Sequence, residues 1–205
     1  MKNTIMLCLL VSFGTYAQKI RPYAGISGYI NSAFEQSGFG DLKLGVECSI
    51  FYYLKPEIEV SYMLGALEEV TKKNEAGLVL DSYQGKVSAV NYSLCSKILL
   101  GNKNDGDGYV QILPKYTYSN IQAQTTKKNE HKEKVYDTKH SLGIGLGYVI
   151  DFSEENPQTI ALNLYFNNID LGYALNKLEL GKDYKTSDVI GFGVNYYFSL
   201  KNKNK

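Results

Sequence analysis

The chain has 205 residues, among them 18 tyrosines, 19 glycines, four prolines and no tryptophan, and its formal net charge is +1. A charge this close to zero gives no support to a nucleic-acid partner, and we expect none. The two histidines and three cysteines do not fall at metal-ligand spacing, so we expect neither a metal nor a cofactor.

The first 17 residues have the features of a secretory signal peptide. Lys2 supplies the positive charge, residues 5–11 form a short apolar run, and Thr15-Tyr16-Ala17 ends the segment with the small residues that signal peptidase requires. The apolar run is too short to be a transmembrane helix. We therefore predict a signal peptide over residues 1–17 and a single domain over residues 18–205.

Within the domain, apolar residues alternate with polar, small or charged ones, which is the period of a β-strand. The clearest segment covers residues 42–54, and a second segment, residues 57–66, follows the pair Lys55-Pro56. Because proline cannot donate a ladder hydrogen bond, we expect this pair at the turn of a β-hairpin. The apolar positions of the first segment are Leu42, Leu44, Val46, Cys48, Ile50, Tyr52 and Leu54.

Six further segments bring the number of predicted strands to eight. Pro114 falls inside one of them, and we expect a bulge or a local break at that residue because it has no amide donor. The pattern predicts an all-β fold, an eight-stranded antiparallel up-and-down transmembrane β-barrel. The six segments are residues 21–31, 90–100, 109–121, 141–151, 159–167 and 190–198.

The connections between the predicted strands alternate between short and long. Outer-membrane barrels have short periplasmic turns and long external loops, with both termini in the periplasm, and all seven connections fit that order. The short connections are residues 54–56, 101–108 and 151–157, and the long ones are residues 32–40, 68–85, 122–138 and 171–186.

The two faces of the strands differ in charge. The apolar face carries no Asp, Glu, Lys or Arg in the strand cores, and tyrosines lie on it mostly toward the strand ends, where aromatic girdles meet the membrane–water interface. We therefore expect this face to contact lipid. A greasy interior would exclude charge as well, so a soluble lipocalin-like carrier of small apolar ligands is an alternative. The charged residues of the polar face are Lys43, Glu47, Glu57, Glu59, Lys97, Lys115 and Lys139.

Three segments resemble the small bacterial outer-membrane β-barrel family of the OmpA/OmpX type. They are the signal ending Thr15-Tyr16-Ala17-Gln18, the hairpin over residues 51–57 and the aromatic-rich last strand over residues 191–198. The resemblance implies a location in the cell outer membrane and contact with its lipid and lipopolysaccharide. It also implies that the barrel-assembly machinery reads the last strand during biogenesis.

The sequence contains no arrangement of residues that is typical of catalysis. His140 adjoins Ser141, but neighbours on a strand point to opposite faces and cannot form a dyad. His131 lies in a charged external loop with several lysines, which is read either as a solvated loop or as a contact for lipopolysaccharide phosphates. We expect Glu57 and Glu59 to form salt bridges with luminal lysines, the minor alternative being an ion path.

The sequence therefore predicts a non-enzymatic, porin-like integral protein of the cell envelope, which has a structural role or presents loops for binding. The first alternative is an outer-membrane barrel that modifies lipids as an enzyme or assists secretion or assembly. The second alternative is the soluble carrier. We predict no catalytic, cofactor-binding or metal-binding residues.

We further expect that Cys48 and Cys95 do not form a disulfide, because a strand lies between them. Glu47→Gln should be tolerated unless Glu47 belongs to a buried ion pair.

Overall fold

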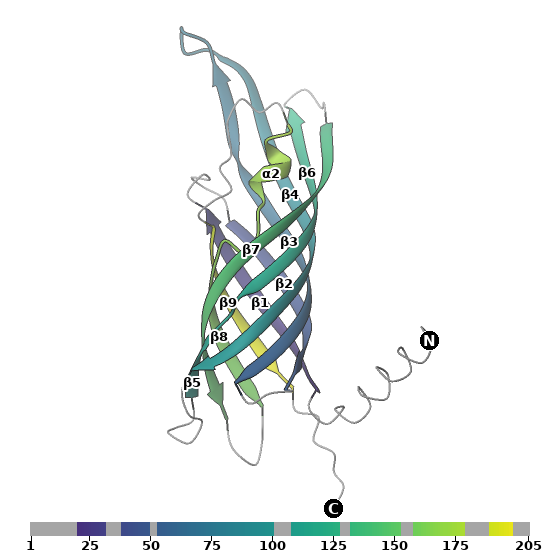
Figure 1. Cartoon of the computed structure of the whole chain (residues 1–205). Coiled ribbons are helices and arrows are strands. Elements are labelled where there is room, and N and C mark those ends of the chain that lie inside the picture. The colour runs from purple at the N-terminus through teal and green to yellow at the C-terminus, as the bar shows by residue number, and fades with distance from the viewer. Residues whose placement is uncertain are drawn as a thin grey trace, which may run out of the picture.

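The computed structural model shows an antiparallel β-barrel (Figure 1). The predicted signal peptide over residues 1–17 lies outside the residues that the structure describes. Among the described residues, no helix is long and apolar enough to cross a bilayer. The structure describes residues 20–31, 38–49, 53–100, 108–127, 132–152, 158–178 and 189–198.

The strands pair in chain order, and the last strand pairs with the first, which closes the ring. Because β5 and β6 both lie between β4 and β7, the nine strands occupy eight positions, and the predicted eight-stranded up-and-down topology is confirmed. The elements are β1 (Ile20–Asn31), β2 (Gly38–Cys48), β3 (Leu54–Lys73), β4 (Val79–Leu100), β5 (Gly108–Ile112), β6 (Lys115–Lys127), β7 (Lys132–Asp151), β8 (Thr159–Phe166), α2 (Gly172–Leu175) and β9 (Val189–Tyr197).

The break between β5 and β6 lies at Leu113 and Pro114, as the sequence predicts. Leu113 and Gly145 exchange both backbone hydrogen bonds, with N···O distances of 2.8 and 2.9 Å, and the carbonyl of Pro114 accepts from the amide of Ser96 at 3.0 Å. The neighbouring strands therefore stay connected across the break. Only the donor that proline lacks is lost from the ladder.

The predicted turn at Lys55-Pro56 is wrong. Strand β2 ends at Cys48 and β3 begins at Leu54, so Pro56 lies inside β3 and pairs with Ser96 of β4. Proline is tolerated here because it is close to the beginning of the strand, where one ladder donor can be spared. Residues 50–52, which the sequence places in the first strand of this hairpin, lie outside the described residues.

Two of the predicted long loops are also wrong. Residues 68–85 are mainly strand, since β3 runs to Lys73 and β4 begins at Val79, and the tight turn between them uses Gly77 at a φ of +78°. Residues 122–138 are likewise mainly strand, because β6 runs to Lys127 and β7 begins at Lys132; His131 is outside the described residues. Strands β3, β4, β6 and β7 therefore project beyond the other strands, at the upper end in Figure 1.

We call these projecting parts of β3, β4, β6 and β7 the extension. Within the barrel wall, apolar side chains point outward, but in the extension the phase is inverted. Val87, Ala89 and Ile121 are buried on its inner face, whereas Lys86 and Asn120 are exposed on its outer face. This is the arrangement of a sheet that buries one face and exposes the other to water.

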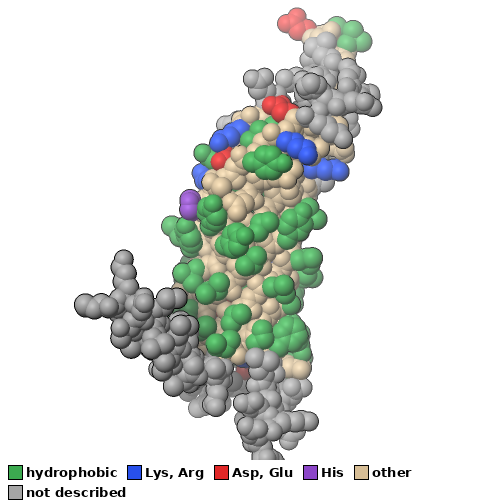
Figure 2. Space-filling model, turned by 90° about the vertical axis from the view of Figure 1, so that its right-hand side faces the viewer, with side chains coloured by type: hydrophobic (Ala, Val, Ile, Leu, Met, Phe, Trp, Pro, Cys, Tyr) green, Lys and Arg blue, Asp and Glu red, His purple; other side chains and the backbone are tan. Residues whose placement is uncertain are grey.

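The wall of the barrel has the predicted orientation of its faces. Leu44 is 69% exposed, whereas the neighbouring Lys43 is 1% exposed, and the other strands follow the same alternation. Figure 2 shows hydrophobic side chains distributed over this wall and charged side chains gathered above it. We call this exterior the apolar belt. Charged residues inside and apolar residues outside are what a lipid-facing barrel requires.

Aromatic side chains lie at both edges of the apolar belt. At the upper edge, the rings of Tyr92 and Tyr118 have centroids 6.3 Å apart, and Tyr62 is exposed on the adjacent strand. At the lower edge, Tyr53 and Phe152 are exposed near the ends of their strands. These are the positions that aromatic girdles occupy in membrane barrels, because Tyr and Phe favour the boundary between hydrocarbon and water. The predicted girdle residue at position 52 is outside the described residues.

Candidate functional site

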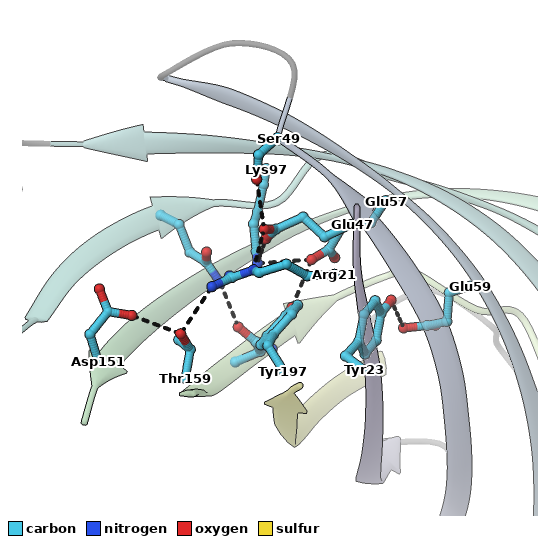
Figure 3. A network of polar contacts seen from close by, with 12 residues as sticks. Arg21, Tyr23, Glu47, Ser49, Glu57, Glu59, Lys97, Asp151, Thr159 and Tyr197 are labelled. Atoms are coloured by element: carbon cyan, nitrogen blue, oxygen red, sulfur yellow. Dashed lines mark hydrogen bonds and ion pairs between the residues drawn. The ribbon is translucent and has the colours of Figure 1, made fainter. Parts of the chain in front are cut away.

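A network of ion pairs crosses the lower half of the lumen (Figure 3). Lys97 of β4 lies at its centre, with Nζ 2.5 Å from a carboxylate oxygen of Glu47 and 2.8 Å from one of Glu57. Arg21 of β1 contacts the other oxygen of Glu47 at 3.0 Å, and the hydroxyl of Tyr197 donates to Glu57 at 2.7 Å. Five strands therefore meet through one set of contacts.

The network continues to the opposite wall. Arg21 Nη1 donates to the hydroxyl of Thr159 at 3.1 Å, and that hydroxyl donates to Asp151 at 2.7 Å. Lys97 Nζ also lies 3.8 Å from the centroid of the Tyr197 ring. The charges are paired, as buried charges must be, and they fill the narrow interior of an eight-stranded barrel.

A second ion pair lies above the first network. Lys115 Nζ is 2.6 Å from Glu59, whose other oxygen accepts from the hydroxyl of Tyr23 at 3.0 Å. The ring of Tyr165 lies beside two ammonium groups, with its centroid 4.3 Å from Lys43 Nζ and 5.0 Å from Lys115 Nζ. The predicted salt bridges of the two glutamates are therefore confirmed: Glu57 pairs with Lys97, and Glu59 pairs with Lys115.

The upper end of the lumen is filled by apolar side chains of the chain itself. Residues 168–178, which we call the cap, include the short helix α2 and lie in the mouth of the barrel, where Leu171, Leu175 and Leu178 are buried. The predicted long connection over residues 171–186 is confirmed, since β8 ends at Phe166 and β9 begins at Val189. Its described part, residues 171–178, packs inward with apolar side chains instead of extending away from the barrel. The side chains packed around the cap are Tyr29, Phe39, Met63, Val87, Ala89, Ile121, Ala123 and Val189.

Polar contacts fasten the cap to the extension. Lys139 of β7 lies 3.5 Å from Asp170, and Lys177 forms an ion pair with Asp137. The two ammonium groups lie 4.0 and 5.2 Å from the centroid of the Tyr173 ring. Lys139, which the sequence places on the polar face with the luminal charges, thus contacts the cap.

The ion pair of the cap should make its closure depend slightly on pH. The hydrogen bond from Lys177 lowers the pKa of Asp137, so the pair stabilises the closed cap above the ordinary carboxyl pKa of about 3.9. This stabilisation is lost as the pH falls through the lowered pKa. Amide hydrogen exchange of residues 169–178 should be slower in the wild type than in Asp137→Asn near neutral pH, by less than about fivefold because Lys177 is exposed to solvent.

The difference between the two proteins should disappear well below pH of about 4, where both side chains are neutral. Comparing them at the same pH removes the intrinsic pH dependence of amide exchange. A difference that persists in acid would mean that the ion pair does not act on the cap.

The sequence predicts only charged side chains as residues of the lumen and misses three buried tyrosines that contact them. Tyr23, Tyr165 and Tyr197 are buried and line the interior, where they bind carboxylates or lie beside ammonium groups. Their positions carry a usable signal, since Tyr165 and Tyr197 share the polar face of their strands with Asn163 and Asn195. The apolar residues of the cap have no such signal, because they belong to no alternating segment.

The histidine that the structure describes lies on the exterior. His140 is exposed, accepts or donates a hydrogen bond with the hydroxyl of Tyr116, and lies against the ring of Tyr118, whereas Ser141 is buried. The prediction that the two neighbours face opposite sides is confirmed. In the described part of the chain, no group of three or more His, Cys, Asp and Glu side chains could hold a metal ion.

Both cysteines of the domain are free thiols. Cys48 of β2 is half-buried and Cys95 of β4 is buried, and β3 lies between their strands. The positions agree with the predicted register.

Comparisons with known proteins find structural likeness only. No protein-family model matches the sequence, and no curated protein matches it. The solved structure of Neisserial surface protein A is 11% identical, with a TM-score of 0.47, and the match covers 88% of this chain and 96% of that one. A major outer membrane protein from Thermus thermophilus is also 11% identical, with a TM-score of 0.45, and the match covers 87% of this chain and 99% of that one.

Proposed function

We propose that the chain is a non-enzymatic integral protein of the outer membrane, a closed barrel that supports the extension and the cap on the outer cell surface. One observation carries the proposal. The exterior of the wall is apolar and bounded by aromatic residues, while the lumen is filled by ion pairs below and by the cap above. Such a barrel is built to be held in a membrane and to present a surface, rather than to conduct.

The orientation follows from the same features. We place both termini in the periplasm, because the beginning of β1 and the end of β9 lie at the lower end, opposite the extension and the cap. The extension has a buried apolar face and a hydrated outer face, which suits the aqueous side of a membrane boundary. Outer-membrane lipid and lipopolysaccharide surround the belt in this placement, and the barrel-assembly machinery acts on the chain during biogenesis.

The soluble carrier is the alternative that the structure disfavours. A carrier of apolar ligands needs a greasy interior and a hydrated exterior, whereas the wall here has Leu42, Ile58 and Leu142 more than half exposed and Glu47 and Lys97 buried. The enzyme alternative gains no support from His140, because its hydrogen-bond partner is a tyrosine at the edge of the belt.

The proposal is tested by heat modifiability together with cell fractionation. A closed barrel pairs every strand and leaves no open edge, so it should resist sodium dodecyl sulfate until it is heated. Unboiled and boiled samples should migrate differently on a denaturing gel, and the protein should sediment with outer membranes. The same mobility in both samples, together with recovery in the soluble periplasm, would overturn the membrane placement.

A conductance measurement tests the closed lumen separately. Inserted into a planar bilayer, the wild-type barrel should give no steady current. A stable open channel in the wild type would show that the lumen is not closed, even if the membrane placement is correct.

A further inference from the structure

The apolar belt is hollowed on one side by a groove. The groove has a volume of about 780 Å³ and runs over the outer surface of strands β9, β1, β2, β3 and β4. Its floor is low at Ala24, whose small side chain lies between Leu44 of β2 and Tyr196 of β9 in the pairing of the strands. Isoleucine, leucine, valine and tyrosine side chains form the two rims, and the polar residues of the lining, Lys43 and Ser61, are buried, so the exposed surface of the groove is apolar.

The upper rim of the groove follows a single row of paired residues around the barrel. The row passes from Val194 to Ile26, Leu42, Tyr62 and Val90, each paired with the next on the neighbouring strand. Tyr62 belongs to the upper aromatic girdle, so the row reaches the upper edge of the belt at this end.

The same row continues into a second, polar hollow. Val90 pairs with Asn120 of β6, and Asn120 pairs with Thr138 of β7. These two residues line a hollow of about 500 Å³ together with Ile121, Gln122, Asp137 and Tyr136, which is 69% exposed. The carboxylate of Asp137 forms an ion pair with Lys177 of the cap. The apolar groove and the polar hollow therefore adjoin one another along one path that crosses the edge of the belt.

The surface beyond the polar hollow is basic. Lys86 of β4 and Lys134 of β7 are both exposed and both pair with Gln124 of β6, which lies between them. Among the described residues, the outward positions of these three strands beside the hollow carry no Asp or Glu. The nearby carboxylate residues Glu133 and Asp137 lie at inward positions of β7, and Asp137 is paired with Lys177. An anionic group held near the hollow would be attracted by both ammonium groups.

We infer that this path binds one phosphorylated glycolipid of the outer leaflet. An acyl chain lies in the groove over Ala24, the sugar lies against Tyr136 and the side-chain amides of Asn120 and Gln122, and a phosphate lies near Lys86 and Lys134. An apolar groove alone would accept any acyl chain; the adjoining amide, phenol and ammonium groups select a lipid with a sugar and negative charge. The site rests on the proposed function, because only a membrane-inserted barrel meets such a lipid.

The test uses the full-length mature protein refolded into two kinds of vesicle, phosphatidylcholine alone and phosphatidylcholine with bis-phosphorylated lipid A. After extraction with mild detergent and gel filtration, lipid A should remain bound to the barrel, and excess inorganic phosphate should not displace it. Lys86→Gln/Lys134→Gln should weaken retention by about thirtyfold, the effect expected of two basic side chains at an anionic surface. Lys86→Arg/Lys134→Arg should restore it.

A second variant tests the acyl groove. Ala24→Phe places a ring in its floor and should abolish retention, whereas Leu164→Phe, on the exterior of β8 outside the groove, should bind as the wild type does. Insertion of every variant is checked by heat modifiability before lipid is measured.

Each result decides the inference. Loss of lipid A in Ala24→Phe and in the double glutamine variant, with retention in the two controls, supports it. Equal retention of lipid A in all variants overturns the inference. It is also overturned if the inserted wild-type barrel retains no lipid A, or if inorganic phosphate displaces the bound lipid A. None of these results contradicts the membrane placement. A wild-type chain that does not insert overturns the proposed function and the lipid site together.

Discussion

Replacement of Lys97 by methionine should destabilise the barrel by about 3–5 kcal/mol, the effect of removing one partner from a buried ion pair. Methionine has a similar length but cannot pair with the carboxylates of Glu47 and Glu57, which lie 2.5 and 2.8 Å from Lys97 Nζ. Glu47 keeps its contact with Arg21, whereas Glu57 keeps only neutral partners in the network. The free energy of unfolding is measured by urea titration of the protein in lipid vesicles.

A double variant shows whether the loss of stability comes from the unpaired charge of Glu57 or from a loss of packing. Lys97→Met/Glu57→Gln removes the unpaired carboxylate and should recover most of the lost stability. If the double variant is as unstable as Lys97→Met alone, the cost arises from packing. From the sequence, Glu47→Gln was expected to be tolerated unless Glu47 belongs to a buried ion pair. Glu47 is fully buried and pairs with Arg21 and Lys97, so Glu47→Gln should destabilise the barrel.

Replacement of Leu146 by arginine should cost about 2–4 kcal/mol, because a guanidinium near the middle of a bilayer loses its hydration. Leu146 is exposed on β7 and lies midway along that strand between His140, at the upper girdle, and Phe152, at the lower one. The variant is refolded into vesicles and titrated with urea beside the wild type.

Thr138→Arg is the matched control, since Thr138 lies on the same face of the same strand but above the girdle. It should unfold as the wild type does. If Leu146→Arg and Thr138→Arg are equally stable, the belt does not face hydrocarbon, and the membrane placement fails.

The alternation of apolar and polar residues was enough to predict the strands of the wall and the direction of their faces. Alternation at residues 42–47 and 142–147 separates leucines, Val46 and Ile144 from Lys43, Glu47 and glycines, and the structure places the first set outside and the second inside. A period of two is a local property of the strand, so no partner is needed to read it. The break at Pro114 was also predicted from the missing amide donor, whereas the same argument placed Pro56 at a turn, although it lies inside β3 near the beginning of the strand.

The extension and the cap could not be predicted in this way, because they depend on contacts between distant parts of the chain. In β4 the buried positions Val87 and Ala89 have the opposite polarity to Asn91 and Ser93 on the same face, so the apolar phase changes where the strand leaves the belt. Whether the apolar residues of a strand face outward or inward depends on whether lipid or water surrounds the sheet. The alternation along one strand is the same in both cases. Leu171 and Leu175 are buried only because the mouth of the barrel is apolar, a surface that exists once β1 to β9 have closed the ring.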